Sequence, residues 1–396
     1  MVDLLGSSPF RPALTLVVAC CRWPDDEARR AAVSAAAAQL EAWGDVRALA
    51  AAHRVEGLVA QALEVAHVTL TERMKQWRVE SADRIRTAAV LQVRDTLRIS
   101  AALDQVGIAY RILKGTPLAA AAFGTVGLKH SWDIDLLVDP RQAVAAAEVL
   151  AGLGYGPVKP PRPLGSAEFA RWSAVAKDAE FEAAGCSPVE LHWRLHDVPL
   201  QMARLDVHSD VRRIDLLGAA TVPTFTDSAN LAYLAVHGAA AGWSRLKWIA
   251  DFSALLAAQG NSATSIAEAR CHRTGFALDQ ALLLRHQLFA TGLPEGWRDC
   301  PRVRRLTHDA LTVICARSPG RPIERDTAAL RAIRRSRRML MSGPIYAVAL
   351  AVRRLRGIED RQTITLPRGL HWLYWLLRPL TFAGRAVRRG RSSTDE

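Results

Sequence analysis

The sequence lacks the features that would fix a zinc ion, a disulfide framework or a membrane anchor. Its cysteines are few and scattered, they form no C-x-x-C pair, and no histidine spacing is typical of a zinc site. No apolar run reaches the roughly 18–20 residues that a membrane-spanning helix needs. Scattered thiols favour a reducing compartment, so we expect a cytoplasmic protein. The six cysteines are Cys20, Cys21, Cys186, Cys271, Cys300 and Cys315.

A secretory signal is also poorly supported. Val17-Val18-Ala19-Cys20 has the form of a lipoprotein cleavage box, but the apolar run before it is short and its flank carries almost no positive charge. A buried first helix is the simpler interpretation of this segment.

Positive charge is concentrated at one end of the chain. The formal net charge is +13, and the residues from Arg321 to Glu396 include 17 arginines, six acidic residues and no lysine, which leaves +11 there. A basic tail favours an anionic partner, such as the inner membrane face or a phosphorylated substrate, or else forms a solvated helix face. The segment Leu370–Ala386 fits an interfacial membrane helix or a terminal helix packed on the domain. We find no further nucleic-acid motif and do not expect nucleic acid as the substrate.

The pattern along the chain predicts a small mixed-sheet α/β (α+β) core with helical additions at both ends. Residues 1–106 show helical periodicity and form a predicted N-terminal module, which ends at Gly107. Short apolar strands alternate with helices over 107–225, the predicted core. Residues 226–320 return to a helical pattern, and 321–396 form a basic helical segment.

The chemistry is predicted in the stretch LKGTPLAAAAFGTVGLKHSWDIDLLV, residues 113–138. A strand ends in Lys114-Gly115-Thr116, a helix of small residues follows, and the next strand carries Asp133 and Asp135. Strand side chains alternate between faces, so both carboxylates are expected on one face. Glycine lets the backbone approach a phosphate, and a helix N-terminus offers free N–H groups.

A second strand supplies a third carboxylate. Pro188–Leu195 alternates, so Glu190, His192 and Arg194 are expected on one face and the apolar side chains on the other. If this strand lies beside the first, Asp133, Asp135 and Glu190 face one groove. Mg²⁺ prefers a few carboxylates together with phosphate oxygens and water, and in two-metal sites the ions clamp both the attacking and the leaving oxygens. The pattern therefore predicts a site for two Mg²⁺ ions and a nucleoside triphosphate (NTP).

These motifs resemble the uncharacterised nucleotidyltransferase family of bacteria, a branch of the polymerase-β-like superfamily. The resemblance rests on Leu113-Lys114-Gly115, on Asp133 through Val138 and on Glu190-Leu191-His192-Trp193, and it extends over most of the chain. It implies Mg²⁺ binding by Asp133, Asp135 and Glu190 and NTP binding near Gly115-Thr116. Members often accompany biosynthetic genes for natural products or surface polysaccharides.

Further basic residues are candidates for contact with the nucleotide. An arginine is common before the Asp pair in this family, whereas this chain has Lys129 and His130 there. Arg245 and Lys247 begin a predicted helix that also carries Asp251, and they either pair with Asp251 or face the cleft. The full set of predicted nucleotide contacts is Lys114, Gly115, Thr116, Lys129, His192, Arg194, Arg245 and Lys247.

The sequence thus predicts an Mg²⁺-dependent nucleotidyltransferase that moves NMP, on superfamily grounds AMP, to a hydroxyl or phosphate acceptor. Two alternatives stay open. One is a non-catalytic scaffold with the same fold, docked on a membrane or a biosynthetic partner through the basic tail. The other is NMP transfer to a side chain of a partner protein.

Overall fold

The computed structural model describes residues 10–129, 131–198, 201–317, 326–341 and 343–355, together with 370 and 373. His130 lies outside the described residues, as do 356–369 and 374–396 of the basic C-terminal segment and nearly all of the predicted interfacial helix at Leu370–Ala386. Across the ranges described, no helix has both the length and the apolar character to cross a membrane.

Five helices precede the sheet. They are α1 (Arg11–Cys20), α2 (Glu27–Ala37), α3 (Gly44–His53), α4 (Glu56–Val65) and α5 (Glu72–Gln105). The apolar segment Val17–Cys20 forms part of the buried face of α1. The first four helices share one hydrophobic cluster with α9, α10 and α12, which lie much later in the chain. Both helical additions therefore contribute to a common core.

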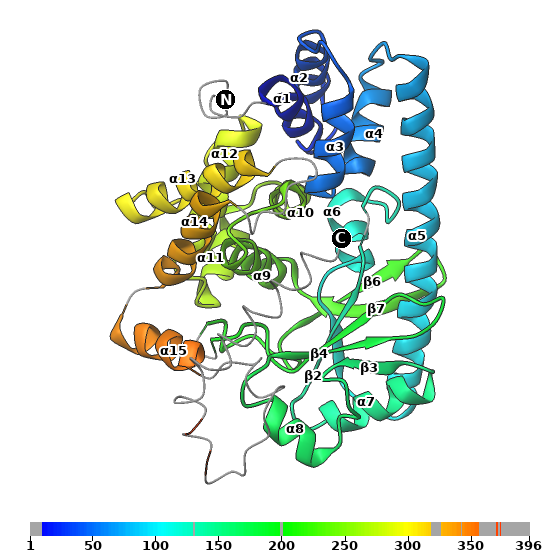
Figure 1. The fold of residues 1–396 in the computed structure, drawn as a ribbon, viewed down its shortest axis with the longest axis vertical. Helices are drawn as coiled ribbons and strands as arrows, with labels where there is room; N and C mark the ends of the chain where they lie inside the picture. The colour runs from blue at the N-terminus through cyan, green and yellow to red at the C-terminus, as the bar shows by residue number, and fades with distance from the viewer. Residues whose placement is uncertain are drawn as a thin grey trace, which may run out of the picture.

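Helix α5 is 34 residues long and extends along one side of the molecule (Figure 1). It contains neither proline nor glycine, and it buries residues at helical spacing, among them Trp77, Ile85, Ala89 and Val93. Gly107 follows with a φ of 70° and turns the chain into the first strand. One end of α5 packs against α4, and the rest contacts α6, α7 and β7. Its residues Ala89, Val93, Ile99 and Leu103 belong to the same hydrophobic cluster as the central sheet.

The central sheet is mixed, as the sequence predicts. Its strands run in the order β1-β2-β5-β4-β3, and only the pairing of β2 with β5 is parallel. The strands are β1 (Tyr110–Ile112), β2 (Ile134–Val138), β3 (Gly156–Lys159), β4 (Asp178–Glu182) and β5 (Val189–His192). Three helices connect or flank them, α6 (Thr116–Phe123), α7 (Ala143–Gly152) and α8 (Ser166–Trp172). The sheet and the faces of α5 and α7 that cover it form a second hydrophobic cluster.

A separate hairpin, β6 (Val211–Leu216) and β7 (Ala220–Phe225), completes the core and was not predicted. Leu217, Gly218 and Ala219 connect its strands, and the first two have positive φ. That backbone geometry suits a tight hairpin turn, which usually carries Asn-Gly or Asp-Gly. Because leucine is unusual in such a turn, the sequence does not indicate this hairpin.

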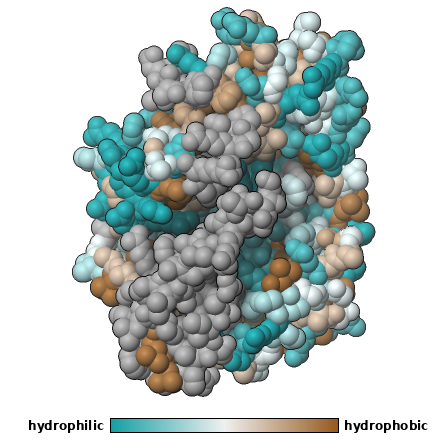
Figure 2. Space-filling view, in the orientation of Figure 1, coloured by the Kyte–Doolittle hydropathy of each residue, from teal (hydrophilic) through white to brown (hydrophobic). Residues whose placement is uncertain are grey.

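The C-terminal part is helical. It comprises α9 (Asp227–Ala240), α10 (Leu246–Ala258), α11 (Ala263–Cys271), α12 (Ala277–Phe289), α13 (Pro301–Ala316), α14 (Thr327–Met339) and α15 (Pro344–Leu355). Helices α13 and α14 pack together and direct arginines outward, and the surface over them is predominantly hydrophilic (Figure 2). Asp309, buried in α13, accepts hydrogen bonds from Arg335 of α14. This ion pair joins the two helices.

Candidate active site

The turn between β1 and α6 places a lysine, a glycine and a threonine in succession beside β2. Leu113 donates its backbone N–H to Asp135, 3.0 Å away, so the turn is fixed to β2. Gly115 precedes α6 with a φ of 73°, a conformation that residues with a side chain rarely adopt. Thr116 is buried, and within the described residues its hydroxyl has no hydrogen-bond partner. The turn thus presents an unused hydroxyl at the start of α6.

The parallel pairing of β2 with β5 brings two of the predicted carboxylates together. Asp135 and Glu190 are directly opposed in the strand register. Asp135 is only 1% exposed, whereas Glu190 is partly accessible. Asp133 lies one residue before β2, where its carbonyl accepts hydrogen bonds from Gln92 (3.0 Å) and Ser131 (3.2 Å). Asp133 is therefore positioned by α5 and by its own loop, not by the strand ladder.

His192 joins the two opposed carboxylates. Its Nε2 lies 3.2 Å from both Asp135 Oδ1 and Glu190 Oε2. Its Nδ1 lies 3.3 Å from the ammonium of Lys177. Because an ammonium can only donate, Nδ1 accepts in this contact, and the ring proton is at Nε2, between the carboxylates.

Lys114 completes the network. Its Nζ lies 2.9 Å from Asp135 Oδ1. The second carboxylate oxygen of Asp135, Oδ2, is buried and has no hydrogen-bond partner among the described residues. Among those residues, the one group of side chains with the character of metal ligands is Asp135, Glu190 and His192, whose ligand atoms all lie within 4.8 Å of one another. The Asp133 carboxylate lies outside this group.

The charges of the site separate the pKa values of its carboxyls. Burial, and then the charge of Asp135, raise the pKa of Asp133 to about 6. Burial would also raise the pKa of Asp135, but the adjacent Lys114 ammonium and the His192 hydrogen bond hold it below its usual range. Burial would raise the pKa of Glu190 as well, but the His192 hydrogen bond and the charges of His192 and Lys114 together lower it. Asp135 and Glu190 are therefore ionised at neutral pH.

Lys129 lies in a different environment from the one the sequence suggested. Its ammonium is buried, 2.6 Å from Asp251 Oδ2 in α10. Asp251 was expected to pair with Arg245 or Lys247, whereas in the structure it pairs with Lys129, 122 residues earlier in the chain. This contact links the loop before β2 to the C-terminal helices.

The remaining predicted contacts are dispersed. Arg194 lies beyond the end of β5 and donates to the carbonyls of Ser173 and Ala176. Arg245 precedes α10, with its guanidinium carbon 5.6 Å from the centre of the Trp248 ring. Lys247 makes no hydrogen bond or close ion pair with the described residues, and burial followed by the charge of Lys129 lowers its pKa to about 8.

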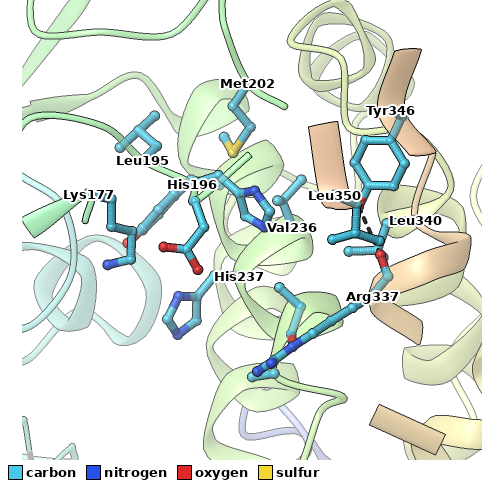
Figure 3. Close-up of a pocket in the computed structure, with 14 residues that line it drawn as sticks. Lys177, Leu195, His196, Met202, Val236, His237, Arg337, Leu340, Tyr346 and Leu350 are labelled. Carbon is cyan, nitrogen blue, oxygen red and sulfur yellow. Dashed lines mark hydrogen bonds between the residues drawn. The ribbon is translucent and has the colours of Figure 1, made fainter. Parts of the chain in front are cut away.

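A cavity adjoins this network on the side of α9, α14 and α15. Figure 3 shows Lys177, Leu195 and His237 on one side of it and Arg337, Leu340 and Tyr346 on the other. Lys177 also contacts His192, so it belongs to both the cavity wall and the carboxylate network. Burial, and then the Lys114 charge, hold the pKa of His237 well below its usual range. His237 is therefore neutral at physiological pH.

Sequence reasoning missed Gln92, Lys177 and the cavity-lining Tyr233. Gln92 lies in the middle of a long helix, where the helical periodicity gives no sign of a polar contact with Asp133. Lys177 comes directly before β4, whose pairing with β5 places this lysine beside His192. The sequence does predict that strands at 179–183 and 188–195 pair through the Gly185 turn, and the register of that hairpin would have indicated Lys177.

The comparison with protein families agrees with this geometry. Residues 39–290 match a family described as uncharacterised nucleotidyltransferase. This range includes the Lys114 turn, all three predicted carboxylates and helices α9 and α10. A comparison with curated proteins found no match.

Proposed function

Because the chain belongs to the uncharacterised nucleotidyltransferase family and is thus a transferase, we propose that it moves NMP from an Mg²⁺-bound NTP to a hydroxyl or phosphate acceptor. The observation that carries the proposal is the pairing of Asp135 with Glu190 on parallel strands, beside the Lys114-Gly115-Thr116 turn. We take AMP as the group transferred, as in much of the superfamily.

The residues present fit a divalent cation. Asp135 has a buried carboxylate oxygen without a partner among the described residues, and Asp135 and Glu190 are both ionised. Such oxygen donors suit Mg²⁺, which takes few protein ligands and completes its shell with phosphate and water. Asp133, Asp135 and Glu190 would hold two ions. When bound, Mg²⁺ would neutralise charge on the triphosphate.

The chain's own residues then have distinct roles. Lys114 and the N–H groups at the start of α6 would bind phosphate oxygens, and the Thr116 hydroxyl would donate to one of them. The acceptor oxygen forms a bond to the α-phosphorus, the bond from that phosphorus to the bridging oxygen breaks, and pyrophosphate leaves. The acceptor's proton passes towards Glu190. Catalysis would thus come mainly from positioning and charge stabilisation.

The cavity of Figure 3 is a suitable place for the acceptor. It is reached from the carboxylate network through Lys177, and it combines apolar side chains with basic ones. An acceptor with an apolar body and a phosphate or hydroxyl group fits this lining.

The proposal is tested by titration calorimetry of four NTPs, with and without Mg²⁺. We expect the wild type to bind at least one NTP only when Mg²⁺ is present, and Asp133→Asn/Asp135→Asn to lose that binding, because the variant removes the anionic ligands. Glu182→Gln, which changes an exposed carboxylate at the end of β4, is the matched control and should bind like the wild type. A folded wild type that binds no NTP would instead support the scaffold alternative.

A further inference from the structure

Arg54 has a left-handed backbone conformation, which is unfavourable for a residue with a side chain. It follows the last residue of α3 with φ 56° and ψ 46°, in the left-handed region. Helices often end with a residue in this conformation, but it is usually glycine, since left-handed geometry is unfavourable for residues with a side chain. The environment of the Arg54 side chain is therefore of particular interest.

A hydrogen bond holds the end of α3 against the start of α10. The adjacent residue His53 is buried, and its Nδ1 accepts the backbone N–H of Leu246 at 3.2 Å. Leu246 begins α10, and the next residue is Lys247. This hydrogen bond fixes the end of α3 beside the start of α10. Arg54 and Lys247, which are distant in the sequence, are therefore close enough for their charges to interact.

The side chain of Arg54 lies next to the predicted metal ligands. Its guanidinium carbon is 5.3 Å from the centre of the Trp132 ring. Trp132 immediately precedes Asp133, and more than half of its surface (55%) is exposed. Burial lowers the pKa of Arg54, and the charge of Asp133 opposes this effect. Within the described part of the chain, the guanidinium makes no hydrogen bond or ion pair.

Lys114 and Lys247 act on the Asp133 carboxylate through their charges, and Arg54 lies over the ring of the adjacent residue, Trp132. The two lysines offer point charges, whereas a guanidinium is a planar fork that binds two phosphate oxygens at once. Residues 129–132, just before Asp133, include no arginine. Arg54 is therefore the cation of this group that can offer a bidentate donor.

We propose that Arg54 binds the triphosphate of the nucleotide and stacks on Trp132 to hold its guanidinium in place. This inference rests on the proposed function, since it assigns a ligand contact within the same site. It predicts that the N-terminal helices contribute directly to substrate binding.

The experiment compares MgATP and AMP binding by calorimetry for the wild type, Arg54→Lys, Arg54→Gln and Arg54→Gly. Loss of a charge-assisted bidentate contact should weaken MgATP binding by about tenfold or more and leave AMP binding within about twofold. Arg54→Lys should keep part of the affinity. Arg54→Gly should bind MgATP as weakly as Arg54→Gln while unfolding at an equal or higher temperature, because glycine relieves the left-handed backbone.

Arg273 is the matched control, because it is also left-handed (φ 56°) but exposed, after α11. Arg273→Gln should leave MgATP affinity unchanged, and Arg273→Gly should raise the unfolding temperature alone. Normal MgATP binding by Arg54→Gln would overturn the inference, and so would an equal loss for ATP and AMP, which would mean that Arg54 only positions Trp132. A wild type that binds no NTP would overturn the proposed function itself.

Discussion

Among single residues, Lys247 is notable because its surroundings disfavour the protonated form of its side chain. Burial and the nearby Lys129 ammonium both disfavour protonation, and together they lower its pKa to about 8. The charge of Asp251 offsets this only in part, and its carboxylate is paired with Lys129. An anionic ligand such as a triphosphate would relieve the repulsion among Lys247, Lys114 and Arg54.

This arrangement predicts a pH dependence of nucleotide affinity. The protonated ammonium binds phosphate, so MgATP affinity should be highest between the Asp133 pKa of about 6 and the Lys247 pKa of about 8, and it should fall as the pH rises through 8. Bound phosphate raises the pKa of Lys247. Between its pKa in the free protein and its higher pKa in the complex, MgATP affinity can fall by up to tenfold per pH unit. Calorimetry from pH 7 to 9.5 measures it. Lys247→Met should bind more weakly at pH 7 and lose this dependence, and an unchanged profile would contradict the assignment.

Among the elements, α5 has a role beyond packing. Its Gln92 is almost fully buried and reaches across to the carbonyl of Asp133, so this helix helps to position a predicted metal ligand that no strand holds. Ser131 is the second donor to the same carbonyl. The geometry at Asp133 thus depends on a side chain 41 residues earlier in the sequence.

Gln92→Leu should destabilise the protein by about 1–2 kcal/mol, because a buried carbonyl loses a donor. It should also weaken Mg²⁺-dependent nucleotide binding, since Asp133 is less constrained. Chemical denaturation and calorimetry measure the two effects. Gln76→Leu, on the exposed face of the same helix, is the control and should change neither quantity. A loss of stability without any loss of affinity would show that Gln92 does not position Asp133.

The sequence predicted local features of the site better than distant ones. The Lys114-Gly115-Thr116 turn precedes a helix as expected, and the alternation around Glu190 correctly indicated that this strand could face the aspartates. The strand was expected to include Asp133, but it begins one residue later because Gln92 and Ser131 bind the carbonyl. Such contacts join segments far apart in sequence, and local periodicity carries no information about them.

On the scale of the whole molecule, the buried pair of Lys129 and Asp251 connects the catalytic core to the C-terminal helices. Both side chains are nearly inaccessible, so each charge depends on the other for compensation. The sequence predicts a nucleotide contact for Lys129, whereas this pairing favours a structural role. The two roles can be separated by changing both partners.

Lys129→Met alone should reduce the free energy of unfolding by about 3–5 kcal/mol, because it leaves Asp251 buried without a partner. The double variant Lys129→Met/Asp251→Leu should recover most of this loss. Denaturant titration measures both. If the double variant is stable yet binds MgATP much more weakly than the wild type, Lys129 contacts the nucleotide; unchanged affinity would confine it to a structural role.

The cavity beside the carboxylates is lined by two parts of the chain, one inside the range that matches the family and one beyond it. Lys177 and His237 lie within the range that matches the family, 39–290, whereas Arg337, Leu340 and Tyr346 lie beyond it. If the acceptor occupies this cavity as proposed, one wall of its site comes from the range that matches the family and the other from α14 and α15. Changes in those two helices would then alter the choice of acceptor without touching the residues proposed to bind the nucleotide.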